Sequence, residues 1–144
     1  MTRLLRTCGL ISLIAITLLS CSQTDDPQFE SINEQIDYMI DQNRYEEALD
    51  YLDESTSDER ERNRLREKVH LNYGLYSMNT FDEDEMRTRM NDALRQFIRV
   101  LEINSDNDVA RTQIDQILQV YETIPDRQPE DDVQEGLREV GFNI

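Results

Sequence analysis

The chain has 144 residues with 31 acidic and 15 basic side chains, a net charge of −16 and 38% hydrophobic residues, which is enough for one domain. This charge argues against nucleic acid as a partner, because binding a phosphate backbone requires a basic surface that displaces counterions. With four Gly, two Cys and one His, the chain also lacks a Gly-rich phosphate loop and the ligand set of a zinc site. We therefore expect no catalytic residue, no cofactor and no metal.

Residues 1–20 have the composition of a secretory signal peptide. Two Arg precede an apolar run, residues 8–19, which is shorter than the about 20 residues needed to span a bilayer. Leu18-Leu19-Ser20-Cys21 resembles the lipobox of bacterial lipoproteins, in which the chain is cleaved before a Cys that carries lipid. The resemblance implies lipidation of Cys21 and, because the two Arg are removed, a mature net charge of −18. An ordinary signal peptide or an uncleaved anchor is the alternative.

Residues 21–30 form a polar, acidic tether. The Asp that retains lipoproteins in the inner membrane of enteric bacteria is absent after Cys21, where Ser22 stands. By this resemblance we expect a protein of the cell envelope that is anchored by lipid to the outer membrane and faces the periplasm. The acidic run also resembles the tether that directs some lipoproteins to the cell surface, so surface display is the alternative.

The mature region is predicted to be all-α, because its apolar residues recur at helical spacing and no stretch alternates with the period of a strand. Ser31 with Glu34 forms a capping box for a first helix that ends at Asn43. A second helix begins near Tyr45 and stops in the polar run of residues 55–57. Its predicted core residues are Tyr45, Ala48, Leu49 and Leu52.

Two longer helices follow. Asp58 with Glu61 caps the third, which reaches about Met78. Asp82 with Glu85 caps the fourth, which we expect to be the longest. Its apolar face consists of Met86, Met90, Ala93, Leu94, Phe97, Val100 and Leu101.

Two more helices complete the prediction. Ser105 with Asp108 opens the fifth, which ends before Pro125. The sixth has Pro129 in its first turn and Gly141 after its last turn. It is flanked by Glu130, Asp131 and Asp132 at its positive end.

The segment from Asn43 to Leu49, NRYEEAL, resembles the turn and second-helix start of a tetratricopeptide repeat. Asn72-Tyr73-Gly74 resembles the middle of that family's first helix, and the spacing of Ala93, Phe97, Val100 and Leu101 is similar to its second helix. The resemblance implies a short tetratricopeptide-like array of about five helices over residues 31–124. Residues 125–144 then form a linker and a C-terminal capping helix. A generic helical bundle is the alternative.

In this family the first helix of each repeat lines a concave groove that binds a peptide or a partner helix. By register, the resemblance assigns to the groove Glu30, Asn33, Asp37, Ile40, Asp41, Lys68, Leu71, Leu75, Met78, Thr112, Gln116 and Gln119. The acidic positions of the first repeat do not suit the family's capture of a terminal carboxylate. They favour a basic amphipathic segment, whose apolar side would contact Leu71, Leu75 and Met78.

The sequence therefore predicts a membrane-tethered adaptor that binds another envelope protein or a basic amphipathic peptide segment. One alternative is a structural lipoprotein that forms a homodimer, and another is an enzyme that acts on cell-wall material through two carboxylates. The acidic run at residues 81–85 lacks the Gly-turned loop of a calcium site. His70 has no neighbouring metal ligand, so we expect a partly buried helix residue there.

Overall fold

The computed structural model describes residues 28–55, 58–80, 85–124 and 127–144. Over these ranges the chain forms only helices, which confirms the all-α prediction. The helices are α1 (Ile32–Asp41), α2 (Tyr45–Ser55), α3 (Glu59–Asn79), α4 (Met86–Ile103), α5 (Asp108–Thr123) and α6 (Asp131–Glu139). The predicted signal peptide, Cys21 and most of the tether lie outside the described residues.

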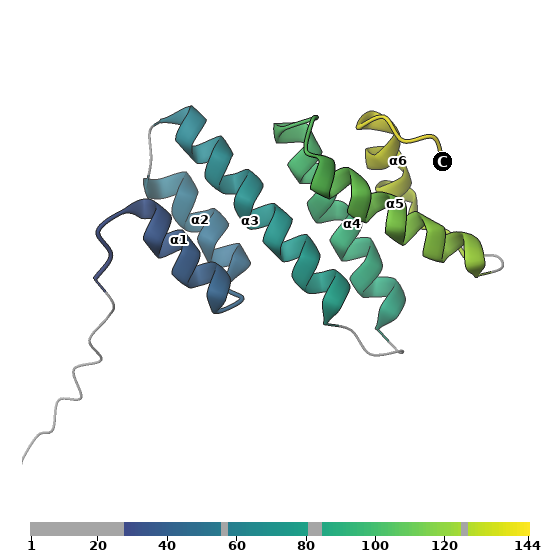
Figure 1. Ribbon diagram of the computed structural model, residues 1–144, viewed down its shortest axis with the longest axis horizontal. Coiled ribbons are helices and arrows are strands. Elements are labelled where there is room, and N and C mark those ends of the chain that lie inside the picture. Colours follow the sequence, from purple (N-terminus) through teal and green to yellow (C-terminus); the bar gives the residue numbers. More distant parts are fainter. Residues whose placement is uncertain (1–27, 56–57, 81–84, 125–126) are drawn as a thin grey trace, which may run out of the picture.

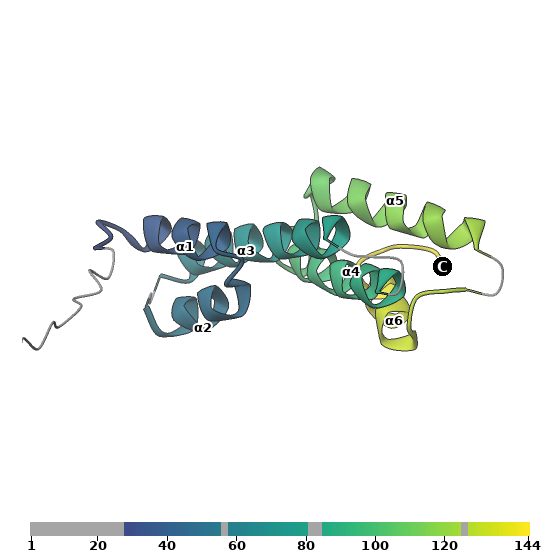
Figure 2. The same ribbon diagram turned by 90° about the horizontal axis from the view of Figure 1, so that it is seen from below.

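The helices are arranged in two rows. Figure 2 shows α1, α3 and α5 along one side of the molecule and α2, α4 and α6 along the other. Each helix runs roughly alongside its neighbours, and α3 and α4 cross the centre (Figure 1). The most extensive packing joins α3 to α4, while α3 also contacts α1 and α2, and both α5 and α6 pack on α4.

Two of the predicted helix starts are formed by the expected side chains. The Oγ of Ser31 accepts a hydrogen bond from the N–H of Glu34 at 3.2 Å. The Oδ1 of Asp58 accepts from the N–H groups of Arg60 and Glu61 at 2.9 Å and 3.3 Å. These bonds satisfy backbone donors that have no partner within the helix. Local sequence therefore determines where α1 and α3 begin.

Two helix ends also follow the prediction. Asn43, which follows α1, has φ 57°, and Gly141, which follows α6, has φ 96°. In each case the next amide donates to a carbonyl five residues back, at 2.8 Å after α1 and 2.9 Å after α6. This left-handed termination reverses the chain and satisfies two carbonyls at the helix end.

Three predicted details are wrong. The longest helix is α3, with 21 residues, and α4 has 18. Asn107 and not Ser105 caps α5, because its Oδ1 accepts from the N–H of Ala110 at 2.9 Å. Pro129 precedes α6 instead of lying in its first turn, since the helix begins at Asp131. The predicted Asp82 cap and the Pro125 stop lie outside the described residues.

The buried side chains form two clusters that meet at α3. The smaller core joins α1, α2 and α3 and consists of Ile36, Met39, Tyr45, Ala48, Leu52, Leu65 and Val69. The larger core joins α4, α5 and α6 and includes all the predicted α4 residues except Met86, which packs against it half-buried. Since α3 also places Leu71, Leu75 and Met78 against the larger core, this one helix contributes to both.

Small residues allow the helices to approach closely. Ala48 of α2 has no exposed surface in the smaller core. At Gly74 of α3, a Cβ atom would lie 2.6 Å from Cε1 of Phe97, which is fully buried in α4. The aromatic ring therefore lies directly against the α3 backbone, and this contact fixes the separation of the two central helices.

Candidate functional site

The predicted groove face begins with a polar network between α1 and α3. Nδ2 of Asn33 donates to Oδ2 of Asp37 at 3.0 Å, and Lys68 forms an ion pair with the same carboxylate. Arg64 donates to Oδ1 of Asn33 at 3.4 Å. Three predicted groove residues, Asn33, Asp37 and Lys68, are thus brought together. Because Lys68 partly neutralises Asp37, this face is less acidic than its sequence suggests.

The apolar side chains of the predicted groove are partly buried, so only part of each can contact a partner. Ile40 packs against the smaller core, and Leu71, Leu75 and Met78 are half-buried against the larger core. Asp41 and Glu30 are exposed at the two ends of α1. A partner on this face would therefore contact the outer part of these side chains, because their inner parts already hold α3 in place.

The third set of predicted residues lies on α5. Thr112 is exposed, and its Oγ1 donates to the carbonyl of Asp108 at 2.8 Å. Gln116 and Gln119 are also exposed. Among the described residues, no hydrogen bond joins these three side chains to the predicted residues of α1 or α3, so the structure does not unite the third set with the first two.

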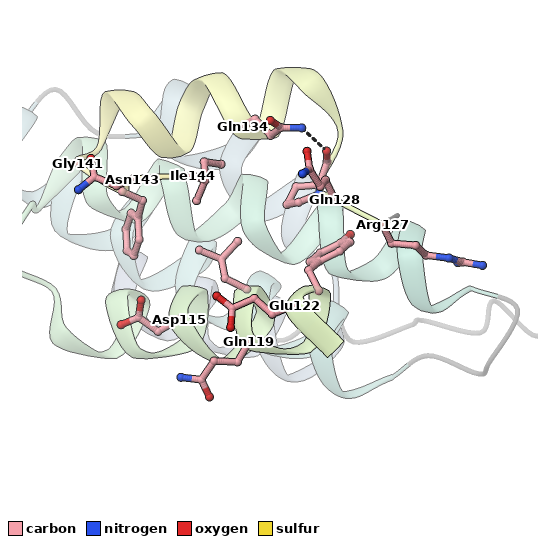
Figure 3. Close-up of a pocket in the computed structure, with 13 residues that line it drawn as sticks. Asp115, Gln119, Glu122, Arg127, Gln128, Gln134, Gly141, Asn143 and Ile144 are labelled. Carbon is pink, nitrogen blue, oxygen red and sulfur yellow. Dashed lines mark hydrogen bonds between the residues drawn. The ribbon is translucent and has the colours of Figure 1, made fainter. Parts of the chain in front are cut away.

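A cleft of about 650 Å³ opens between α5 and the C-terminal segment. Figure 3 shows Asp115 and Glu122 of α5 on the side that faces the segment containing Asn143 and Ile144, while the amide of Gln119, which also borders the cleft, is directed away from that segment. Gln134 borders the cleft and donates from Nε2 to the carbonyl of Pro129 at 2.8 Å. Of the predicted groove residues, only Gln119 lines this cleft. The other walls come from residues 127–129 and 141–144, whose path no periodic pattern predicts.

Tyr121 forms part of the inner wall of this cleft. Burial raises the pKa of its phenol, so the hydroxyl stays protonated at neutral pH. No described residue forms a hydrogen bond with that buried hydroxyl. The lining residues that the structure describes offer amides, carboxylates and a guanidinium, which can form hydrogen bonds, and among them there is no paired nucleophile and base.

Glu130 and Asp132, at the start of α6, are held to α4 by polar contacts. Arg95 donates to Asp132 at 2.9 Å and to Glu130 at 2.6 Å. The hydrogen bond from Arg95 is the main reason that the pKa of the Asp132 carboxyl is lowered. Asn91 is fully buried, and its Oδ1 accepts from the N–H of Glu130 at 3.0 Å. These contacts position α6 across α4.

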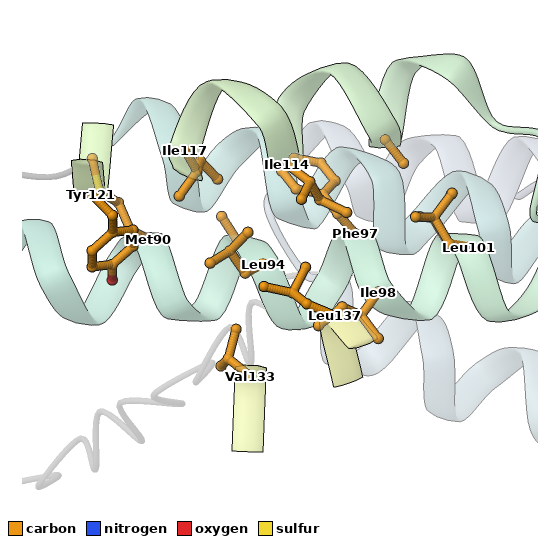
Figure 4. Close-up of a cluster of buried hydrophobic side chains, with 13 residues drawn as sticks. Met90, Leu94, Phe97, Ile98, Leu101, Ile114, Ile117, Tyr121, Val133 and Leu137 are labelled. Carbon is orange, nitrogen blue, oxygen red and sulfur yellow. The ribbon is translucent and has the colours of Figure 1, made fainter. Parts of the chain in front are cut away.

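Apolar contacts complete the attachment of α6. Figure 4 shows Val133 and Leu137 directed toward the α4 side chains Leu94 and Ile98. A Cβ atom at Gly136 would lie 3.1 Å from Cδ1 of Ile98, so the α6 backbone rests almost directly on this side chain. Ile98 was not predicted as a core residue, because only the later helix covers it.

His70 has the role expected of it. The side chain is partly buried on α3, and its Nδ1 forms a hydrogen bond with Oε1 of Gln96 at 2.8 Å. Burial lowers the pKa of the imidazole, so His70 is neutral at neutral pH. Within the described ranges, no three His, Cys, Asp or Glu side chains come together in a way that could hold a metal ion.

None of the helices in the described part of the chain has the length and apolar character required to cross a membrane. Comparison with known protein families, with curated proteins and with solved structures finds no match.

Proposed function

We propose that the protein is a lipid-anchored adaptor of the bacterial cell envelope, whose tetratricopeptide-like helical array binds a partner protein. The observation that carries this proposal is the two-row arrangement, in which α1, α3 and α5 share one side (Figure 2). On that side Asn33, Asp37 and Lys68 come together, as the register of the repeat predicts. The close approach at Ala48 and Gly74 also favours the repeat interpretation.

The proposed location rests on the N-terminal sequence. The apolar run before Cys21 and the lipobox-like residues favour cleavage and lipidation. Each buried acyl CH₂ contributes about 0.8 kcal/mol, so several chains would attach the protein to the membrane almost permanently. We place the anchor in the outer membrane with the helical array in the periplasm, and surface display is the alternative.

The proposed partner is another envelope protein that presents a basic amphipathic segment. The mature chain would have a net charge of −18, which attracts a basic partner over a distance and increases the association rate. The apolar side chains on the helical surfaces would then provide most of the affinity. This division of roles is typical of helical recognition surfaces.

A specific observation favours a second candidate, a homodimer. Val109 and Val120 of α5 are 48% and 36% exposed and are eleven residues apart, which places them on the same side of the helix. Among the described helices, α5 packs mainly on α4. Its outer side could therefore bury these two residues against a second copy.

Site-specific photocross-linking in cells separates the two candidates. A photoreactive amino acid at the exposed position 116 of α5 should form an adduct with a different envelope protein. The same amino acid at position 54, on the exposed side of α2, serves as the control. An adduct only between two copies of this chain would support the homodimer. Equal adducts at both positions, or none at position 116, would refute the adaptor.

A further inference from the structure

The exposed surface of α5 is divided into a charged part and an uncharged part. Six exposed side chains carry no charge, and at about 100° per residue they fall within an arc of about 100°. They are Val109, Thr112, Gln116, Gln119, Val120 and Thr123. We call these six residues the α5 stripe. The four charged residues of the helix fall outside this arc, and two of them, Asp115 and Glu122, line the cleft against the C-terminal segment.

The α5 stripe lies roughly opposite the buried side of the helix, which faces α4 and consists of Ala110, Ile114, Ile117 and Tyr121. Figure 1 shows the C-terminal segment and α3 on opposite sides of α5. Since the acids of α5 are on the side of the C-terminal segment, the stripe is turned outward and toward the side of α3. It therefore belongs to the α1, α3 and α5 side, on which the partner is proposed to bind.

The C-terminal half of α3 is also free of charge. No residue from 69 to 80 is charged, since burial keeps His70 neutral, whereas 32% of the whole chain is charged. Leu71, Leu75 and Met78 lie in this half with their outer parts accessible. Depletion of charged residues is typical of the centre of a protein interface. The two neighbouring helices therefore share a feature that a fully solvated surface does not require.

The α5 stripe also has groups that no described residue uses. Val109 and Val120 are 48% and 36% exposed. The side-chain amides of Gln116 and Gln119 are exposed and form no hydrogen bond with any described residue. Apolar surface and hydrogen-bonding groups are thus available together along three turns of the helix.

The shape of the stripe indicates a helix as its occupant. Val109 and Val120 are about 16 Å apart along the axis, at about 1.5 Å per residue. A partner helix that lies along α5 can contact both, because the stripe stays on one side over this length. A strand could not be added, since the backbone groups of α5 are already paired within the helix.

Charge favours a different protein over a second copy. Two copies, each with a net charge of −16, repel one another. Asp115 and Glu122 form no ion pair within the described part of the chain, so they add negative charge beside the stripe. A partner that has an uncharged contact side, with Lys or Arg next to it, complements both the stripe and these acids.

We propose that the α5 stripe binds an amphipathic helix of the partner protein through an uncharged contact side. This inference rests on the proposed adaptor function and locates its main contact on α5. Apolar and uncharged polar residues of the partner helix contact Val109, Gln116 and Val120. Its Lys or Arg residues lie at the edge, beside Asp115 and Glu122. Apolar contact and hydrogen bonds to the amides hold the complex, and charge steers the encounter.

A photocross-linking scan of α5, made with the full chain in cells, tests this proposal. The photoreactive amino acid is placed at the stripe positions 109, 112, 116 and 120, and at positions 115 and 122 beside the stripe. Adducts with a different envelope protein should form at the stripe positions and be weaker at positions 115 and 122. The reverse order would place the partner in the cleft against the C-terminal segment and overturn the stripe.

A charge variant with a matched control gives a second measurement. Gln116→Glu adds a carboxylate of nearly the same shape in the middle of the stripe, and Gln128→Glu adds it at an exposed position outside the stripe. With the photoreactive amino acid at position 112, Gln116→Glu should reduce the adduct about tenfold, because an unpaired charge is costly to bury. Gln128→Glu should leave the adduct unchanged. Thermal unfolding of both variants checks that the fold is intact.

The stripe and the adaptor fail in different ways. If position 116 forms an adduct with a different protein but positions 115 and 122 do so equally, or Gln116→Glu has no effect, the adaptor stands and the stripe is wrong. If no adduct with a different protein forms at position 116, the adaptor is wrong. Adducts only between copies of this chain would overturn both.

Discussion

Replacing Gly74 by Ala tests the close contact between α3 and α4. The new Cβ would lie 2.6 Å from Cε1 of Phe97 and 2.9 Å from both Cδ1 and Cζ of the same ring. The ring has no exposed surface and is held inside the larger core. It cannot turn away without disturbing its neighbours, so the helices must move apart.

The expected effect is the difference of two opposing terms. Overpacking a well-packed core costs about 1–3 kcal/mol. Ala is favoured over Gly inside a helix by about 1 kcal/mol. We therefore expect Gly74→Ala to lower the free energy of unfolding by about 0–2 kcal/mol. The upper end of this range would lower the melting temperature by several degrees in a chain of this size.

Gly136→Ala provides the control that isolates the contact. Its Cβ would lie 3.1 Å from the Cδ1 methyl of Ile98, which is the flexible end of a side chain and can move. Both substitutions gain the same helix propensity, so their difference, about 1–3 kcal/mol, reports the cost of the Phe97 contact. Urea denaturation followed by circular dichroism measures both. If Gly74→Ala is as stable as Gly136→Ala, the close contact does not exist.

Three further predictions concern the anchor and two titrating groups. Cys21→Ser should move the protein from the membrane to the soluble envelope fraction, as measured by fractionation and immunoblotting. Because the hydrogen bond from Arg95 lowers the pKa of Asp132, the stability that this pair contributes is present above about pH 4 and is lost as the pH falls through the lowered pKa. Asp132→Asn should therefore lower the urea midpoint at neutral pH and flatten its decline in acid. Burial lowers the pKa of His70, so as the pH falls the imidazole of the unfolded state takes up a proton at a higher pH than that of the folded state. The free energy of unfolding should therefore decrease as the pH drops below about 6.5. His70→Gln should remove this part of the pH dependence, measured from urea midpoints between about pH 7 and pH 5.

Each of these predictions has a contradicting result. Retention of the Cys21→Ser protein in membranes after a carbonate wash would exclude the lipid anchor. A pH profile of Asp132→Asn that parallels the parent in acid would show that the contact with Arg95 does not couple to folding. For His70→Gln, an unchanged decline below neutral pH would mean that the imidazole is solvated in the folded protein.

Local signals in the sequence predicted much of the fold. Ser31 and Asp58 were identified as caps and Asn43 and Gly141 as helix ends, because each of these features depends on residues close together in the chain. The apolar face of α4 was predicted because 3.6-residue periodicity reports which side of a helix is buried. That same periodicity does not report which helix covers it.

The details that were predicted wrongly depend on distant contacts. Ser105 and Asn107 are both good cap residues, and local sequence does not rank them. In the structure, the amides of Asn104 and Asn107 both donate to Oε1 of Glu67 on α3, each at 2.8 Å. Glu67 and Asn107 are 40 positions apart in the sequence. This contact fixes the turn between α4 and α5 and selects Asn107 as the cap.

The candidate surfaces also differ in whether they depend on regular spacing or on distant contacts. The structure brings together Asn33, Asp37 and Lys68, which the register assigns to the first helices of successive repeats. Their role in a groove stays a prediction. The cleft between α5 and the C-terminal segment could not be found by register, because it is formed by segments that no periodic pattern places beside each other.

The division of the interior into two cores has a mechanical consequence. In the described part of the chain the smaller core contains seven buried side chains and the larger contains thirteen, and α3 contributes two residues to the first and packs half-buried side chains against the second. Tension applied to the chain ahead of α1 is therefore borne first by the smaller group. The α1–α2 hairpin would peel away while α4, α5 and α6 stay assembled, so the molecule could lengthen under load without losing its main body.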